Sequence, residues 1–185
     1  DLLKSTSSEL VLEYNFNGFA QNDKRSNNET YQYLHIDGFS KMGELGKPAL
    51  PAHNDVILIP GGDNVQIEII SSQYRTLDGY NIHPTLEGAS DEEGTPEPSF
   101  YKDETSYQTN AFFPSSIVKL IEVQKLRGTN LGIIQIRPIQ FNPVTHQIRV
   151  YTSIMYRLVF NGNKSAFQSL STNTSTNSLN NMRAS

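Results

Sequence analysis

The 185-residue sequence contains no cysteine and no tryptophan. The absence of cysteine excludes disulfide bonds, thiolate metal ligands and a cysteine nucleophile. Apolar residues make up 36% of the sequence, so the hydrophobic core is modest and depends on Tyr, Phe, Ile and Leu. This length and composition predict one domain with a core of its own, or one domain and a tail.

Clusters of basic residues and long apolar runs are also missing. The formal net charge is −4 and no stripe of Lys and Arg is present. This argues against nucleic acid as a partner, because phosphate binding needs clustered basic side chains. No stretch approaches the roughly 18 apolar residues that a membrane-spanning helix needs. The start, DLLKSTSSEL, lacks the charged-then-apolar pattern of a signal sequence. We interpret it as a start exposed by processing, which leaves export open.

Alternation of apolar and polar residues dominates the chain. The segments ELVLEYNFNGF (9–19), NVQIEII (64–70) and HQIRVYTSIMYRLVF (146–160) place apolar side chains at alternate positions. This period predicts strands with one buried and one solvated face. The segments DVILIP (55–60) and LGIIQIRP (131–138) are apolar enough for more central strands, and each ends at a proline, which cannot donate to a sheet.

Helical periodicity is scarce. The segment SSIVKLIEVQKL (115–126) allows one or two helical turns, but its β-branched residues fit a strand equally well. We therefore predict an all-β fold, a single antiparallel β-sandwich or a distorted barrel.

Two segments differ in composition from the rest. Residues 84–110 are acidic, aperiodic and interrupted by Pro and Gly, and loops of this length are usually functional or disordered. Residues 161–185 are mostly Asn, Ser and Thr, with too few apolar residues to offset the entropy of ordering them. The sequence thus predicts a β-sandwich domain over residues 1–160 with a long acidic loop, and a flexible linker or processing tail over residues 161–185.

Motifs for catalysis or metal binding are absent from the sequence. The acidic run Asp91, Glu92 and Glu93 lacks the alternating ligands and the glycine of an EF-hand calcium loop. No Gly-x-Ser-x-Gly nucleophile turn occurs. None of the histidines has metal-ligand spacing; they are His35, His53, His83 and His146. We expect no catalytic residue, no metal and no cofactor.

Several short motifs follow one another along the chain. They are GKPALP (46–51), YNIHP (80–84), FFP (112–114), RG (127–128) and PIQFNPVTHQIRVYTSI (138–154). The last contains Asn142-Pro143, which favours a turn and predicts a hairpin between two core strands. Over about residues 40–160 this series resembles the N-terminal prodomain of gingipain-type cysteine endopeptidases (the Arg/Lys-gingipain family) of the Bacteroidota.

The resemblance implies a non-catalytic propeptide of a secreted protease. Such a prodomain is a β-sandwich that covers the active-site cleft of the cysteine protease, keeps the zymogen latent during export and assists its folding. The implied partner is the catalytic domain of the cognate protease, and the implied location is secreted or periplasmic, including the cell surface.

The resemblance also implies a loop that places a side chain in the pocket for the substrate residue before the cut. Members that cleave after Arg or Lys are expected to insert a basic residue, but EGASDEEGTPEP (87–98) has none. We expect Asp91, with Glu92 and Glu93, to make the inhibitory contact. Three interpretations stay open: the cognate protease prefers a non-basic residue, another part such as Lys102 inserts, or the module has little inhibitory role.

The tail offers a maturation site at Arg183, in NNMRAS, because it is the only basic residue after Lys164 and lies in a segment of the kind that proteases cut. An incidental arginine is the alternative. Two other classes of protein compete with the prodomain interpretation: a cell-surface carbohydrate-binding or adhesion β-sandwich module, and an enzyme with an unrecognised carboxylate site.

Overall fold

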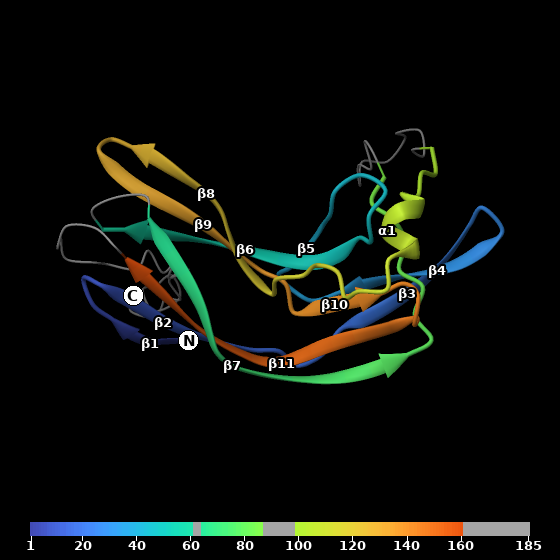
Figure 1. Ribbon diagram of the computed structural model, residues 1–185, viewed down its shortest axis with the longest axis horizontal. Helices are drawn as coiled ribbons and strands as arrows, with labels where there is room; N and C mark the ends of the chain where they lie inside the picture. The colour runs from blue at the N-terminus through green and yellow to red at the C-terminus, as the bar shows by residue number, and fades with distance from the viewer. Residues whose placement is uncertain (61–63, 87–98, 161–185) are drawn as a thin grey trace, which may run out of the picture.

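The computed structural model describes residues 1–60, 64–86 and 99–160, and almost all of its regular structure is β (Figure 1). One sheet contains β1 (Leu2–Ser5), β2 (Glu9–Asn15), β7 (Val65–Asp78), β10 (Ile139–Asn142) and β11 (Gln147–Phe160). A second sheet has the order β5 (Ser40–Met42), β6 (Leu50–Ile59), β9 (Thr129–Ile136) and β8 (Val118–Leu126). A separate hairpin is formed by β3 (Ala20–Ser26) and β4 (Glu29–His35), and α1 spans Glu104–Gln108.

Strand β11 organises the first sheet. One of its edges pairs antiparallel with β7 over its whole length, from Gln147 opposite Asp78 to Phe160 opposite Val65. Its other edge pairs first with β10 and then with β2. The buried residues of its inner face follow the predicted alternation; they are Ile148, Val150, Ile154, Tyr156, Leu158 and Phe160.

The two sheets lie as layers, with the first sheet below the second in Figure 1. The larger core cluster joins them, as Ile57 of β6 and Ile134 of β9 pack with Tyr156 of β11. A second cluster lies toward the other end, where Leu34 of the β3–β4 hairpin meets Phe141 of β10. The prediction of an antiparallel β-sandwich is therefore confirmed, and the sheets do not close into a barrel.

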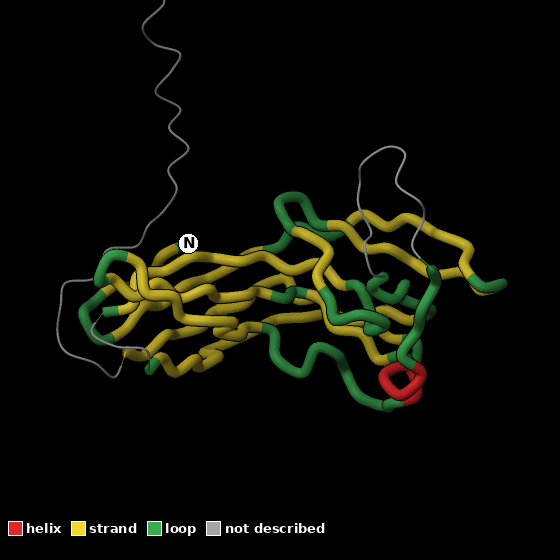
Figure 2. The backbone as a smooth tube through the Cα atoms, turned by 90° about the horizontal axis from the view of Figure 1, so that it is seen from above, coloured by secondary structure: helices red, strands yellow, loops and turns green. Residues whose placement is uncertain are grey.

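Two local predictions can be compared with the structure. The ambiguous segment 115–126 contains strand β8 and no helix. The acidic segment 84–110 is not wholly irregular, because it contains the short helix α1. Figure 2 shows this helix at the end of the elongated molecule that lies opposite the N-terminus. The predicted tail, residues 161–185, lies outside the described residues and stays a prediction.

Candidate functional site

The two stems of the acidic loop are joined by a single backbone segment. On one side, the Gly46 N–H donates to the Thr85 carbonyl (2.8 Å) and the Thr85 N–H donates to the Lys47 carbonyl (2.8 Å). On the other side, the Asp103 N–H donates to the Gly46 carbonyl (3.0 Å). Gly46 therefore contacts both stems through its own backbone. We refer to Gly46, Lys47, Thr85 and Asp103 as the loop base.

Only glycine fits at the centre of the loop base. Gly46 has φ +77°, a conformation that disfavours side chains. A Cβ atom on Gly46 would lie 2.5 Å from Cε1 of Tyr101 and 2.9 Å from the backbone nitrogen of Asp103. The GKPALP motif thus has a structural explanation, since its first residue lets the two stems approach one backbone segment.

Helix α1 fixes the second stem. The carboxylate of Asp103 caps it, accepting from the Thr105 N–H (3.1 Å) and from the Ser106 hydroxyl (2.6 Å). The bond from Ser106 is the main reason that the pKa of Asp103 is lowered. At the other end of the helix, the Tyr107 hydroxyl donates to the Ile82 carbonyl on the first stem (2.6 Å), and burial raises the pKa of Tyr107. The helix therefore connects the two stems a second time.

A buried histidine lies under the first stem. His83 is fully buried, its ring stacks on Tyr33 (centroids 4.5 Å apart) and meets Phe100 of the second stem edge-on (5.7 Å). Nδ1 lies 2.8 Å from the Pro84 carbonyl, which can only accept, so Nδ1 carries a proton. Nε2 accepts from the Ser26 hydroxyl (3.1 Å). Burial lowers the pKa of His83, so its imidazole is neutral in this site.

The FFP motif supports the loop from the core side. The N–H of Phe113 donates to the Phe141 carbonyl (2.8 Å), and the N–H of Phe141 donates back to the Phe113 carbonyl (2.7 Å). The Gln140 amide donates to the Pro114 carbonyl (2.7 Å). The segment that follows the loop is thereby attached to β10, which belongs to the predicted hairpin.

The predicted contact residues Asp91, Glu92 and Glu93 and the predicted processing residue Arg183 lie outside the described residues. Lys102, the alternative insertion residue, belongs to the second stem. Its Nζ lies 3.5 Å from a carboxylate oxygen of Glu104 and 3.8 Å from one of Glu29, and its side chain is only 19% exposed. Insertion of Lys102 into a partner would require both ion pairs to break.

The histidines hold no metal centre in the described ranges. Across residues 1–60, 64–86 and 99–160, His, Asp and Glu form no group of three that is suited to a metal ion. The other histidines make ordinary local contacts. Nε2 of His53 lies 3.2 Å from Asp55 and its Nδ1 lies 3.0 Å from the Gly38 carbonyl, Nε2 of His35 lies 3.3 Å from Asp37, and Nδ1 of His146 lies 3.0 Å from the Tyr80 carbonyl. No helix in this part of the chain is long and apolar enough to cross a membrane.

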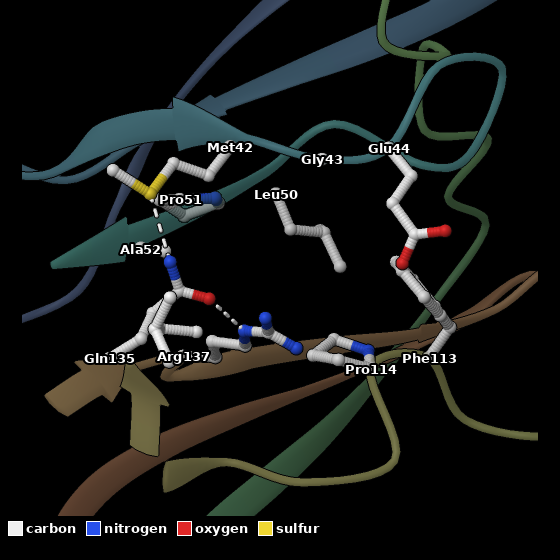
Figure 3. Close-up of a pocket in the computed structure, with 11 residues that line it drawn as sticks. Met42, Gly43, Glu44, Leu50, Pro51, Ala52, Phe113, Pro114, Gln135 and Arg137 are labelled. Carbon is white, nitrogen blue, oxygen red and sulfur yellow. Dashed lines mark hydrogen bonds between the residues drawn. The ribbon is translucent and has the colours of Figure 1, made fainter. Parts of the chain in front are cut away.

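A pocket of about 260 Å³ opens beside the loop base, between the β5–β6 connection and the end of β9 (Figure 3). Gly43 and Glu44 line one side, and Gln135 and Arg137 line another. Sequence reasoning did not select Arg137. Its signal was a single charged residue at the end of the otherwise apolar segment LGIIQIRP.

A larger hollow of about 420 Å³ lies between the β2–β3 and β4–β5 connections. Its rings Phe16, Phe19 and Phe39 come from these connections and pack partly on one another or on neighbours, as in the edge-on contact of Phe16 with Phe39 (5.9 Å). A carbohydrate-binding module would be expected to display such rings on a concave sheet face. Three of the four phenyl or phenol rings in this hollow, Phe16, Phe19 and Phe39, lie on connections, and the fourth, Tyr14, comes from strand β2.

Two solved structures share the fold of this chain. The chain superposes on the complex of Porphyromonas gingivalis RgpB pro- and mature domains with a TM-score of 0.77, at 22% identity over 90% of this chain and 86% of that chain. The structure on zymogenic latency of gingipain K from Porphyromonas gingivalis gives a TM-score of 0.71, at 19% identity over 88% of this chain and 92% of that chain. The fold is that of a gingipain prodomain.

The family follows from the sequence profile. The profile Propeptide_C25 matches residues 1–185, and the chain belongs to this propeptide family. Among curated relatives, Gingipain R1 of Porphyromonas gingivalis is 29% identical over 113 residues, which are 61% of this chain and 11% of that protein. Lys-gingipain of the same species is 23% identical over 157 residues, 80% of this chain and 9% of that protein. The chain thus spans about a tenth of the relatives it matches. The predicted resemblance is confirmed, and the chain is a non-catalytic prodomain of a cysteine peptidase.

Proposed function

We propose that this chain keeps its cognate gingipain-like cysteine protease latent by covering the active-site cleft, and that it assists folding of the precursor. The observation in the structure that carries this proposal is the loop base. Gly46 binds both stems of the acidic loop, and α1 binds the second stem to the first. A loop presented from fixed stems loses less conformational entropy when it enters a cleft, which strengthens binding.

Tethering explains why a modest interface is sufficient in the precursor. A flexible connection holds an intramolecular inhibitor at an effective concentration in the millimolar range, so even micromolar affinity keeps the cleft mostly occupied. We assign this connection to residues 161–185 and the covering body to residues 1–160. After cleavage the advantage is lost, and continued inhibition needs an interface of about 1,600 Å² with good complementarity.

The inhibitory contact is assigned to Asp91, with Glu92 and Glu93 beside it. The motivation is that EGASDEEGTPEP, the segment between the two stems, contains no basic residue. Asp91→Ala should weaken inhibition of the cognate catalytic domain by about tenfold or more, as expected when a central contact is removed. Glu97→Ala in the same segment is the matched control and should have little effect. Unchanged inhibition by Asp91→Ala would show that this assignment is wrong.

Maturation is assigned to the bond after Arg183. The support is that Arg183 is the only basic residue after Lys164, in a segment poor in apolar residues. N-terminal sequencing of the released catalytic domain should then find Ala184 as the first residue, and Arg183→Gln should abolish that product. A first residue elsewhere removes the proposal.

A secreted or periplasmic location, including the cell surface, accords with a propeptide that silences a protease during export. Fractionation of cells that express the full precursor should place this chain outside the cytoplasm. Recovery of the precursor only from the cytoplasm would contradict this assignment.

Titration tests the function as a whole. Increasing amounts of this chain are added to the cognate catalytic domain, and residual peptidase activity is measured. Activity should fall to near zero at saturation. Full activity at saturating chain would overturn the proposal, and selective binding to a glycan in its place would favour the carbohydrate-binding module.

A further inference from the structure

The Arg137 side chain is held in one orientation at the floor of the pocket beside the loop base (Figure 3). Its backbone N–H donates to the Ile117 carbonyl (2.8 Å), and its Nε donates to Oε1 of Gln135 (2.5 Å). Gln135 is itself buried and fixed, because its Nε2 lies 3.0 Å from Oδ1 of Asn54 and 3.0 Å from Sδ of Met42. These contacts therefore fix the orientation of the guanidinium plane in the free chain.

The outer edge of this guanidinium makes no direct ion pair in the described part of the chain. The side-chain hydrogen bond of Arg137 uses Nε, and no carboxylate lies within ion-pair distance of its terminal nitrogens. Glu44, which also lines the pocket, attracts Arg137 from beyond ion-pair distance, but its carboxylate pairs directly with Nζ of Lys47. Burial lowers the pKa of Arg137, though an arginine at this depth stays charged. A partly buried charge with no anion in direct contact is unfavourable and favours a ligand that supplies one.

The pocket selects the kind of anion. Much of its wall is apolar and suits the methylene stem of an acidic side chain; it includes Leu50, Pro51, Ala52, Phe113, Pro114 and Ile121. The planar fork of an arginine matches a carboxylate in a bidentate geometry. The negative charge of Glu44 on the wall disfavours a doubly charged phosphate, so a single carboxylate is the better occupant.

The location of the pocket suggests where this carboxylate comes from. Gly43 and Glu44 line the pocket, and Gly46, two residues further on, joins the stems of the loop. Figure 1 shows the β5–β6 connection between the β8–β9 hairpin and α1. Ile121, on the other side of the pocket, is 42% exposed and lies at the register shift of β8. The pocket therefore lies next to the base from which the loop leaves the sandwich.

We propose that the Arg137 pocket receives an aspartate or glutamate side chain of the mature catalytic domain, as a second anchor beside the loop. This inference rests on the proposed function. The anchor fixes the orientation of the prodomain over the cleft, because it lies on the body of the sandwich and not on the loop.

The test compares inhibition constants of variants against the cognate catalytic domain. Arg137→Gln should weaken inhibition by about tenfold or more, as expected for loss of a desolvated ion pair. Arg137→Lys should restore part of the loss, because it keeps the charge without the fork. Arg75→Gln, on exposed strand β7, makes the same change in net charge and should alter inhibition less than about twofold. Thermal unfolding of each free variant separates loss of contact from loss of fold.

A second variant keeps the test decisive if Arg137→Gln folds poorly. Ile121→Glu places a carboxylate of this chain at the pocket, where it competes with that of the partner. It should weaken inhibition, whereas Ile121→Gln should not. In the Arg137→Gln background, Ile121→Glu should cause no further loss. Equal effects of Ile121→Glu and Ile121→Gln would overturn the inference.

The outcomes for the two proposals differ. If the unmodified chain inhibits and Arg137→Gln inhibits equally well, the anchor is refuted and the function stands. If the unmodified chain does not inhibit, the proposed function fails first. If acetate shifts the Arg137 Nε–H resonance of the free chain while Arg137→Gln inhibits normally, the pocket binds a small carboxylate, and the inference is overturned.

Discussion

Replacing Gly46 with alanine should destabilise the loop base. A control variant separates the cost of steric crowding from the cost of a side chain at positive φ. The new Cβ atom would lie 2.5 Å from Cε1 and 2.8 Å from Cδ1 of Tyr101, and 2.9 Å from the Asp103 nitrogen. The backbone nitrogen cannot move without stretching its hydrogen bond to the Gly46 carbonyl. Such crowding costs about 1–3 kcal/mol, in addition to roughly 1 kcal/mol for a side chain at positive φ.

Gly38 provides the matched control for this substitution. Its φ is +79° against +77° for Gly46, but a Cβ atom on Gly38 would meet nothing within 4 Å. Gly38→Ala therefore carries the same conformational cost and the same change in the unfolded chain, without the crowding. The difference in unfolding free energy between the two variants should be about 1–3 kcal/mol. Urea unfolding followed by far-ultraviolet circular dichroism measures it, and amide exchange at Asp103 locates it.

The same two variants should also differ in inhibition. Gly46→Ala should inhibit the cognate catalytic domain less well than the unmodified chain, and Gly38→Ala should inhibit as well as it does. If both alanine variants lose the same unfolding free energy and the same inhibition, the crowding against Tyr101 and Asp103 does not contribute to stability. The loop base would then not be what presents the loop.

Three further perturbations follow from single contacts. Tyr107→Phe leaves the Ile82 carbonyl without its hydroxyl donor and should cost about 1–2 kcal/mol. Tyr156→Phe removes a buried hydroxyl that has no hydrogen-bond partner among the described residues and should cost nothing in the same urea assay. Because burial places the pKa of His83 below 6.5 in the folded state, the unfolded chain binds more protons just below that pH. The urea midpoint should therefore be constant above about pH 7 and fall as the pH drops below 6.5. His83→Asn should make this fall shallower. A midpoint of the unmodified chain that does not change from pH 7 to pH 5 would contradict the site geometry. Asn142→Ala removes a buried side chain that accepts from the Val144 N–H (3.1 Å) and donates to Asn110 (2.9 Å), so a loss of about 2 kcal/mol is expected, and a loss below 0.5 kcal/mol would refute it.

The regular parts of the fold could be predicted because their signals are local. Strand β11 follows from fourteen residues of near-regular alternation, and its hairpin with β10 follows from Asn142-Pro143. The β3–β4 hairpin was not predicted, because β3 is polar and mostly exposed and β4 buries only Tyr31 and Leu34. Its signal was the pair Asn27 and Asn28, both of which adopt the positive φ typical of tight hairpin turns.

The site could be predicted only in outline. The acidic composition of residues 84–110 marked the loop, but α1 depends on a hydrogen bond from Tyr107 to Ile82, 25 residues away in sequence. Gly46 likewise acts through Thr85 and Asp103, which are distant in the chain. Contacts of this kind leave no periodicity, so sequence patterns alone do not reveal them.

The central claim is that this chain physically covers the active-site cleft of a cysteine protease. The rate at which iodoacetamide alkylates the catalytic cysteine of the cognate domain tests it most directly. All labelling must come from the protease, because this chain has no cysteine. The alkylation rate should fall in step with added chain and approach zero at saturation. An unchanged rate in a complex shown to be fully formed would mean that the chain binds elsewhere and leaves the cleft open.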